Sequence, residues 1–255
     1  MKTNYHTHTF RCKHASGTDR DYVEAAVANG FSELGFSDHV PYPYQDYTPP
    51  YRMLIHERDD YIKDIGALKQ EYAGKIRILR GFECEALPQY RNYLAELREQ
   101  ADYLILGNHG DESKPDYRYA GFNTRPEHIR EYVDSTLKGM EWGIFSYLCH
   151  PDLTLHSYPV FDAAAKDMSR QISRAAKALN MPLEYNLNGI YNHMGMKDTL
   201  GYPCRMFWEI AAEEGATAIM GVDAHSPQSF AWPEWDAGVH FLHSLGITVL
   251  EKLEL

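Results

Sequence analysis

The stretch TNYHTHTFRCKH, residues 3–14, contains the pattern that decides the fold. Residues 4–8 have the composition of a short β-strand and end in a His-Thr-His triplet. Because side chains alternate across a strand, His6 and His8 point to the same side and can bind one ion together. His14 follows in the loop after the strand. The stretch therefore predicts a strand that carries metal-binding histidines at its carboxyl end.

The rest of the chain repeats this plan of a strand followed by a helix. The predicted strands are residues 4–8, 33–38, 76–84, 103–108, 144–149, 183–188 and 218–223, with a short further strand at 248–251. Helical patterns occupy residues 21–29, 59–72, 90–100, 126–140, 163–179, 205–214 and 237–245. Such alternation is typical of a parallel sheet or barrel. No boundary interrupts it, so one α/β domain over residues 1–255 is expected, with long loops at 40–51 and 110–123.

Histidine or carboxylate side chains stand at the ends of six of the seven main predicted strands. With the histidine of the first loop, they are His6, His8, His14, His39, Glu83, His109, His150, Asp223 and His225. In a βα barrel the carboxyl ends of the strands converge on the face that carries the active site. Seven imidazoles and two carboxylates exceed the coordination capacity of one ion. The sequence therefore predicts two or three divalent metal ions, with manganese, zinc and iron all compatible with these ligands.

Charge and composition restrict the partners of such a site. The formal net charge of −11 argues against nonspecific binding to nucleic acid, which needs a basic surface. Clustered dications would still make the site locally positive and attract a small substrate with a dianionic phosphate group. No apolar run is long enough to cross a membrane, and the first residues lack the apolar core of a secretory signal. The four widely spaced cysteines have no CxxC pair, so reduced thiols and a cytoplasmic location are expected, with the oligomeric state left open.

Residues that contact the substrate are less evident than the metal ligands. Arg52, Arg118 and Arg205 lie in loops or at element ends from which they could reach a phosphate group. His156 lies in a loop after a predicted strand and could approach the substrate.

Carboxylates near the predicted ligands could support them. Glu85 alternates onto the same side as Glu83, while Asp38 and Asp152 neighbour other ligands. Such residues commonly orient metal-binding histidines, although solvent-exposed roles are equally compatible with their positions.

The ordered motifs resemble those of the PHP phosphoesterase superfamily. They are HTH, His14, SDH ending at His39, GFE ending at Glu83, His109, CHPD around His150, and VDAH with Asp223 and His225. The resemblance spans nearly the whole chain and implies a distorted (β/α)7 TIM-like barrel with a trinuclear metal site. The segments SDHVPYP, YPVFD, NLNG, FWEIA and VDAHSP are similar to those of histidinol-phosphate phosphatases. The resemblance thus implies hydrolysis of L-histidinol phosphate to L-histidinol and phosphate, a step of histidine biosynthesis.

The resemblance also implies an assignment of the ligands. His6, His8, Glu83 and Asp223 would bind one metal, Glu83 would bridge to a second metal held by His109 and His150, and His14, His39 and His225 would bind the third. Catalytic roles then fall on Glu83, Asp223 and His225. The segment NLNGIYNHMGM lacks the arginine expected after its strand, so Arg205 or the metals alone would hold the phosphate. Metal coordination lowers the pKa of water from about 15.7 toward roughly 7, which would supply hydroxide without a protein nucleophile.

Other functions share parts of this pattern. An amidohydrolase-type deaminase or amidase also begins with HxH, but it often bridges its metals with a modified lysine, where this chain offers Glu83. Another PHP phosphoesterase could act on a different small phosphate ester, a nucleotide or a phosphodiester. A non-enzymatic metal-binding protein would need no open coordination position.

Overall fold

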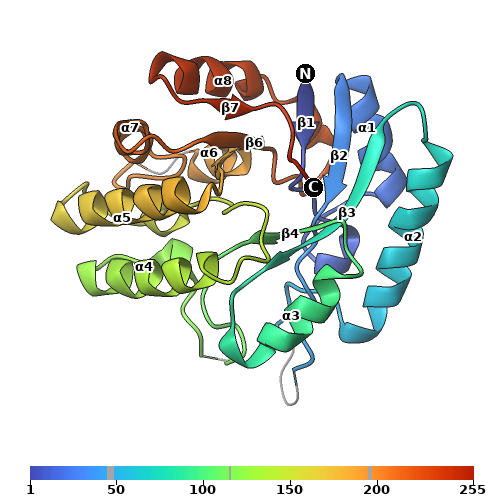
Figure 1. Cartoon of the computed structure of the whole chain (residues 1–255), viewed down its shortest axis with the longest axis horizontal. Coiled ribbons are helices and arrows are strands. Elements are labelled where there is room, and N and C mark those ends of the chain that lie inside the picture. Colours follow the sequence, from blue (N-terminus) through green and yellow to red (C-terminus); the bar gives the residue numbers. More distant parts are fainter. Residues whose placement is uncertain (45–48, 115, 195–196) are drawn as a thin grey trace.

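Short parallel strands form the inner layer of the protein (Figure 1). The computed structural model describes residues 1–44, 49–114, 116–194 and 197–255, so part of the expected loop at 40–51 lies outside the described residues. The strands are β1 (Lys2–Asn4), β2 (Phe31–Phe36), β3 (Arg77–Cys84), β4 (Tyr103–Leu106), β5 (Leu183–Asn186), β6 (Ala218–Gly221) and β7 (Val249–Leu250). They form one sheet in the order β1-β2-β3-β4 and another in the order β5-β6-β7.

Isolated bridges connect the two sheets into a distorted barrel. Thr7, just after β1, pairs with Ala224, just after β6, and Leu148 pairs with both Leu106 of β4 and Leu183 of β5. Every ladder is parallel, so all carboxyl ends lie at the same end of the barrel. The expected α/β barrel is thereby confirmed.

The expectation of a regular strand at residues 144–149 is wrong. Within the described chain Leu148 makes isolated bridges with Leu106 and Leu183, and the backbone of Ser146, Tyr147 and Cys149 also hydrogen-bonds to β4. The backbone leaves the sheet at His150, whose φ is 29°. The segment therefore fills the gap between β4 and β5 without forming a regular strand.

Other expected strands extend past the observed ends. The strands predicted at 4–8, 33–38, 103–108, 183–188 and 218–223 end two to four residues earlier, because their last residues leave the ladder and turn toward the pocket. After β5 the chain enters a helix, α6 (Leu187–His193), that was not expected. The Asn186 side chain caps it by accepting a hydrogen bond from the Gly189 N–H at 3.0 Å.

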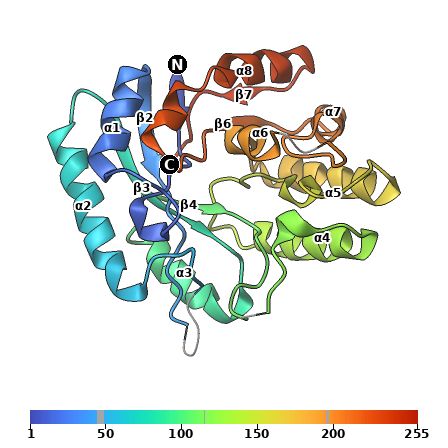
Figure 2. The same ribbon diagram turned by 180° about the vertical axis from the view of Figure 1, so that it is seen from behind.

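Helices cover the outside of the strands (Figures 1 and 2). They are α1 (Asp19–Ala28), α2 (Arg58–Glu71), α3 (Arg91–Arg98), α4 (Pro126–Met140), α5 (Ala163–Leu179), α7 (Arg205–Glu213) and α8 (Glu234–Ser244). Short 3-10 turns lie at Phe10–Cys12, Ile55–Glu57, Pro88–Tyr90, Ala120–Phe122, Leu153–Leu155 and Pro227–Ala231. The predicted bounds of α4 and α5 are confirmed at both ends.

The sequence of α5 explains why that helix forms and which face it buries. Asp162 caps its start by accepting hydrogen bonds from two backbone N–H groups, both at 3.0 Å. Ala165, Met168 and Ile172 are buried and recur at helical spacing, so one apolar stripe packs against the sheet and the neighbouring helices. Asn180 follows in the left-handed conformation that commonly ends a helix.

A small apolar cluster fills the barrel interior below the pocket. Tyr103 belongs to this cluster, and the carbonyls of Tyr5 and Phe36 share its hydroxyl proton, at 2.6 and 3.0 Å from the oxygen. Gly35 and Gly81 leave room for this ring, because a Cβ on Gly35 would lie 2.3 Å from the Tyr103 hydroxyl. The filled interior gives the residues at the strand ends a rigid support.

Candidate metal centre

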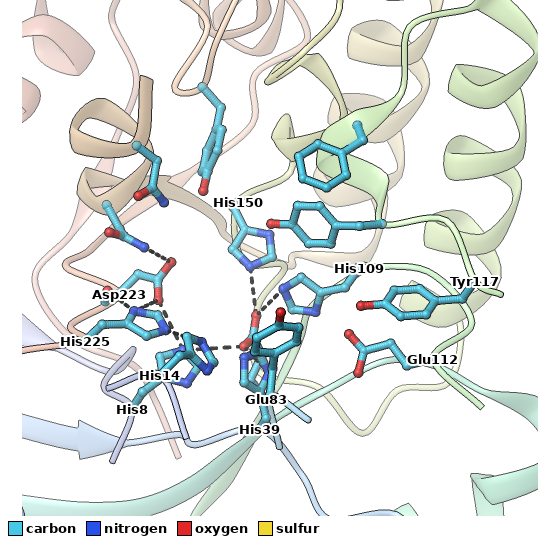
Figure 3. A pocket seen from close by; sticks show the side chains of 16 residues that line it. His8, His14, His39, Glu83, His109, Glu112, Tyr117, His150, Asp223 and His225 are labelled. Atoms are coloured by element: carbon cyan, nitrogen blue, oxygen red, sulfur yellow. Dashed lines mark hydrogen bonds and ion pairs between the residues drawn. The ribbon is translucent and has the colours of Figure 1, made fainter. Parts of the chain in front are cut away.

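The nine predicted ligands lie together at the carboxyl end of the strands, and Figure 3 shows eight of them, all except His6. Eight of them line a cavity of about 500 Å³, namely His8, His14, His39, Glu83, His109, His150, Asp223 and His225. His6 lies beneath the cavity and is completely buried. Side chains separated by more than 200 residues in the sequence are thus direct neighbours, as the barrel topology predicts.

Glu83, near the end of β3, occupies the centre of the cluster. Its Oε1 lies 2.8 Å from His150 Nε2 and 3.3 Å from His109 Nε2. Its Oε2 lies 3.1 Å from His39 Nδ1, 3.5 Å from His6 Nε2 and 3.6 Å from His8 Nε2. The two oxygens of one buried carboxylate therefore face two different sets of imidazoles, an arrangement suited to bridging two cations.

A second group of potential ligands surrounds Asp223, just after β6. Its Oδ1 lies 3.1 Å from His8 Nε2 and 3.4 Å from His6 Nε2. The Nε2 atoms of the two histidines lie 3.2 Å apart. The two imidazoles therefore face the same point, although both residues lie beyond the end of β1. The His-Thr-His triplet thus directs both imidazoles to the same side, as the sequence predicts.

A third group lies nearer the opening of the cavity. His14 Nε2 and His225 Nε2 face each other at 3.0 Å, and the His225 ring stacks on that of His8 with centroids 4.1 Å apart. The His39 ring lies 5.5 Å from that of His14. His8, His39 and His225 also form one of the sets whose ligand atoms lie within 4.8 Å of one another.

The donor atoms fit divalent metals. Glu83 Oε2 and Asp223 Oδ1 are buried and accept no hydrogen bond of regular geometry from the described part of the chain. A buried carboxylate oxygen without a donor is costly, and a cation removes that cost. Imidazole nitrogens and carboxylate oxygens are the ligands that zinc, manganese and iron accept.

Buried carboxylates hold the ligand histidines from behind. Glu184 Oε1 lies 2.9 Å from His6 Nδ1, and Glu85 Oε1 lies 2.7 Å from His109 Nδ1. Each contact places the N–H on Nδ1 and leaves Nε2 free to bind a metal. Glu85 was predicted in this role, whereas Glu184 was missed. A glutamate within the apolar strand LEYN is the sequence feature that could have indicated it.

The other two predicted supports differ from each other. Asp38 Oδ1 lies 3.4 Å from His8 Nδ1 and also accepts from the backbone N–H of His39 at 2.8 Å. Asp152 instead accepts from the backbone N–H of Cys204 at 2.6 Å. Burial raises the pKa of Asp152 to about 7. Asp38 therefore supports the ligand cluster, and Asp152 anchors the segment before α7.

Glycines make room for the central carboxylates. A Cβ on Gly107, just after β4, would lie 2.5 Å from Glu83 Oε1. A Cβ on Gly221, at the end of β6, would lie 2.0 Å from Glu184 Oε1. Both are far below the ordinary contact distance, so the two buried carboxylates depend on these glycines.

Two of the predicted ligands have an unusual backbone. His150 has a φ of 29° and Asp223 a φ of 52°, in the region that residues other than glycine rarely adopt. Each lies directly after a segment that pairs in the barrel. Such conformations cluster at functional sites, where surrounding contacts hold them in place.

The electrostatics follow from this dense packing of imidazoles and carboxylates. Burial opposes ionisation, yet His109 and His6 hold the pKa of Glu83 well below its usual value. Burial likewise opposes protonation of His109, but Glu83 and Glu85 raise the pKa of His109 to about 9. Burial and the neighbouring His8 lower the pKa of His225 to about 3. In the metal-free protein Glu83 is therefore ionised at neutral pH.

Aromatic and amide side chains form the rest of the cavity wall. They are Tyr51, Tyr117, Tyr119, Phe122, Tyr202, Asn188 and Asn192, together with the carboxylate of Glu112. Among the described residues, no lysine or arginine lines this cavity. The basic side chains of the cavity wall are therefore all histidines, the same residues that could bind metal ions.

The predicted substrate contacts are not brought to the cavity wall. Arg52 is buried and bound to Glu85 and Glu112. Arg118 pairs with Glu131, and Arg205 is exposed on α7 and pairs with Glu209 at 2.8 Å.

His156 lies one layer behind the cavity wall. Its ring centroid is 5.7 Å from that of Tyr202, which does line the cavity. The geometry therefore does not favour direct substrate contact by any of the four predicted substrate-binding residues.

The fold and the pocket define a class of protein, namely α/β barrels with a histidine-rich site at the carboxyl ends of the strands, as in metal-dependent hydrolases. The PHP domain family matches residues 4–188. The chain belongs to the PHP domain family.

Individual relatives agree with this membership. The chain is 30% identical over 241 residues to the probable histidinol-phosphatase of Deinococcus radiodurans, an alignment that covers 87% of this chain and 85% of that protein. It is 34% identical over 115 residues to the histidinol-phosphatase of Bacillus subtilis, covering 43% and 40% of the two chains.

Solved structures share the fold at lower identity. The putative histidinol phosphatase of Listeria monocytogenes has a TM-score of 0.74 and 20% identity, covering 91% of this chain and 98% of that one. Histidinol phosphate phosphatase of Lactococcus lactis, in complex with zinc, L-histidinol and phosphate, has a TM-score of 0.73 and 18% identity, covering 100% and 99%. No helix in the described ranges has the length and apolar character needed to span a membrane.

Proposed function

We propose that this protein is a metal-dependent phosphatase that hydrolyses L-histidinol phosphate to L-histidinol and inorganic phosphate. Membership of the PHP family and the names of the relatives support the reaction class and the substrate. The reaction would place the protein in histidine biosynthesis. Four buried free thiols favour a reducing compartment, and we propose the cytoplasm.

One observation carries the proposal. Glu83 directs its two oxygens toward two different sets of imidazoles, at the base of a cavity that no described lysine or arginine lines. Such a cavity offers a phosphate dianion no permanently charged basic side chain, and divalent ions bound by the histidines and carboxylates would neutralise it. The proposed cofactors are accordingly two or three divalent ions, manganese, zinc or iron.

The proposed ligands follow the three groups of side chains. His6, His8, Glu83 and Asp223 would hold one ion, Glu83 with His109 and His150 a second, and His14, His39 and His225 a third. Glu83, Asp223 and His225 have the catalytic roles because they would contact the ions that bind the reacting phosphate. When bound, such ions lower the pKa of water and neutralise phosphate oxygens in an in-line displacement.

The chain itself would position these groups and control access to them. Glu184 and Glu85 hold two histidines in the tautomer that presents Nε2. The aromatic wall around Tyr119 and Tyr202 limits the water around the substrate and strengthens electrostatic interactions within the site. None of these roles requires a protein nucleophile.

Phosphate release from a panel of esters tests the proposal. The panel contains L-histidinol phosphate, a sugar phosphate, a nucleotide and a phosphodiester, with manganese or zinc added. We expect a strong preference for L-histidinol phosphate and loss of all activity in Glu83→Gln. Glu96→Gln, which removes the same charge from an exposed position of α3, is the matched control. Equal activity of Glu83→Gln and native protein would refute the metal mechanism.

The same panel separates the alternatives. Preference for another monoester would keep the mechanism and replace the substrate, and preference for a phosphodiester would indicate a nuclease-type enzyme. Saturable metal binding without hydrolysis of any ester would favour a metal-storage protein or an amidohydrolase, and deamination assays would then distinguish these two.

A further inference from the structure

One carboxylate of the cavity wall belongs to none of the three ligand groups. Glu112 lies in the loop after β4, and its side chain is about nine-tenths buried. It nevertheless lines the cavity, and its oxygens point toward the histidine cluster (Figure 3). A carboxylate beside a phosphate site needs an explanation, because it repels the phosphate group of a substrate.

Arg52 holds Glu112 in a fixed position. The Arg52 Nε and Nη2 donate to Glu112 Oε2 at 3.2 and 2.6 Å. The same Nη2 donates to Glu85 at 2.8 Å, and Nη1 donates to the carbonyl of Val40 at 2.8 Å. Arg52 is therefore fully engaged, and Oε1 of Glu112 stays outside this ion pair. The result is a carboxylate held in place at the cavity wall, with an Oε1 that takes no part in the Arg52 ion pair.

The two carboxylates that share Arg52 differ in their partners. Glu85 contacts both Arg52 and His109 Nδ1, whereas Glu112 is bound by Arg52 through Oε2. Buried charges are stable when they are paired, and a cationic ligand group at Glu112 would give this carboxylate a second partner.

The position of Glu112 determines which part of a ligand it can contact. Glu112 and Glu85 share one Arg52 nitrogen, and Glu85 lies 2.7 Å from His109, a proposed metal ligand. Arg52 and Glu85 thus link Glu112 to His109, and Glu112 and His109 line the same cavity. A positive group a few bonds from the phosphate ester oxygen would therefore share the cavity with Glu112.

We infer that Glu112 is a specificity-determining residue that binds the primary ammonium group of the substrate, so that the protein selects phosphate esters of amino alcohols. The inference rests on the proposed function and deepens it, because in L-histidinol phosphate the amino carbon is bonded directly to the ester carbon. Charge-assisted hydrogen bonds of this kind are short and strong, and a fixed carboxylate forms them at low entropic cost. Arg52 is the positioning residue.

Matched esters test the inference. Native protein and Glu112→Gln are compared on L-histidinol phosphate, on 3-(imidazol-4-yl)propyl phosphate, which lacks only the amino group, and on 2-aminopropyl phosphate, which lacks the ring. Glutamine retains an oxygen for Arg52 but removes the charge. The control Asp111→Asn removes a charge from the neighbouring residue, which does not line the cavity and pairs with Lys114 at 3.1 Å.

For native protein, kcat/KM should be higher for L-histidinol phosphate than for the deaminated ester. Glu112→Gln should reduce that ratio by about 30-fold, mainly through KM, as expected for loss of a desolvated charge pair. Asp111→Asn should leave the ratio unchanged. A folding defect would lower both rates and not their ratio, so the ratio isolates recognition.

The outcomes distinguish this inference from the proposed function. If 2-aminopropyl phosphate is a good substrate in a Glu112-dependent manner and L-histidinol phosphate is not, the proposed substrate is wrong and the inference stands. If L-histidinol phosphate is hydrolysed but the ratio does not change in Glu112→Gln, the inference is overturned alone. Glu112→Gln could instead change the ratio of kcat/KM between L-histidinol phosphate and 2-aminopropyl phosphate but not the ratio between L-histidinol phosphate and the deaminated ester. Glu112 would then recognise the ring, and the inference would also be overturned. Calorimetric binding of L-histidinol, which Glu112→Gln should weaken, gives a readout without turnover, and equal binding would contradict the inference.

Discussion

The packing of Gly107 against Glu83 leads to a quantitative prediction. The Cβ of Gly107→Ala would lie 2.5 Å from Glu83 Oε1, 2.9 Å from its Cγ and 3.0 Å from its Cδ. Ordinary contacts lie near 3.5–4.0 Å, so the carboxylate must move by about 1 Å. The surrounding imidazoles at 2.8 and 3.3 Å oppose that movement. Overpacking of this kind costs about 1–3 kcal/mol of folding stability.

The effect on activity should exceed the effect on stability. A displacement of about 1 Å at a reacting centre can lower the rate about 100-fold, and a displaced Glu83 should also bind metal less tightly. Phosphate release, metal content and thermal unfolding of Gly107→Ala measure the three effects. Gly66→Ala in α2 is the matched control, because its nearest neighbour is an Arg80 nitrogen at 3.7 Å and alanine favours a helix. Native metal content and activity in Gly107→Ala would refute the reasoning.

Three other predictions concern the supports of the site. Glu184→Gln should weaken metal binding about 10–100-fold, because His6 loses the carboxylate that makes its imidazole a stronger metal ligand. Chelator competition measures this affinity, and an unchanged affinity would contradict the role of Glu184. Between pH 6.5 and 9, metal uptake should release a proton from His109, because the raised pKa of about 9 keeps its metal-free imidazole protonated, so apparent affinity should rise with pH. Calorimetry in buffers of different ionisation heat measures that proton, and equal release by His109→Gln would exclude this source. Tyr103→Phe should lower the free energy of unfolding by about 1–3 kcal/mol in denaturant titrations, because two buried carbonyls lose their donor; a change near zero would contradict that role.

The sequence was most informative where the chemistry is local. Strand-end histidines and carboxylates can be identified from their positions after apolar runs, and the structure places all nine in one cluster. The bounds of α5 follow from the Asp162 cap, a buried stripe and Asn180 at its end, and α4 begins at Pro126, a residue favoured in the first turn of a helix. Local patterns of this kind need no knowledge of the tertiary fold.

Sequence reasoning was weaker where partners are distant. Residues 144–149 have the composition of a strand, but they form only isolated bridges at Leu148 and scattered backbone hydrogen bonds to β4, an outcome that depends on strands distant in the sequence. The role of Glu184 depends on contact with His6, 178 residues away. Arg52 was expected to contact phosphate, yet two distant glutamates engage its guanidinium.

The sequence by itself determined which side chains can serve as metal ligands and the order in which a barrel presents them. Only the tertiary structure decided which nitrogen faces which oxygen, which carboxylates are buried behind the ligands, and that the cavity wall offers Glu112 rather than an arginine. The physical reason is that ligand identity depends on the side chain alone, whereas charge pairing and orientation depend on neighbours that the fold brings within about 3 Å.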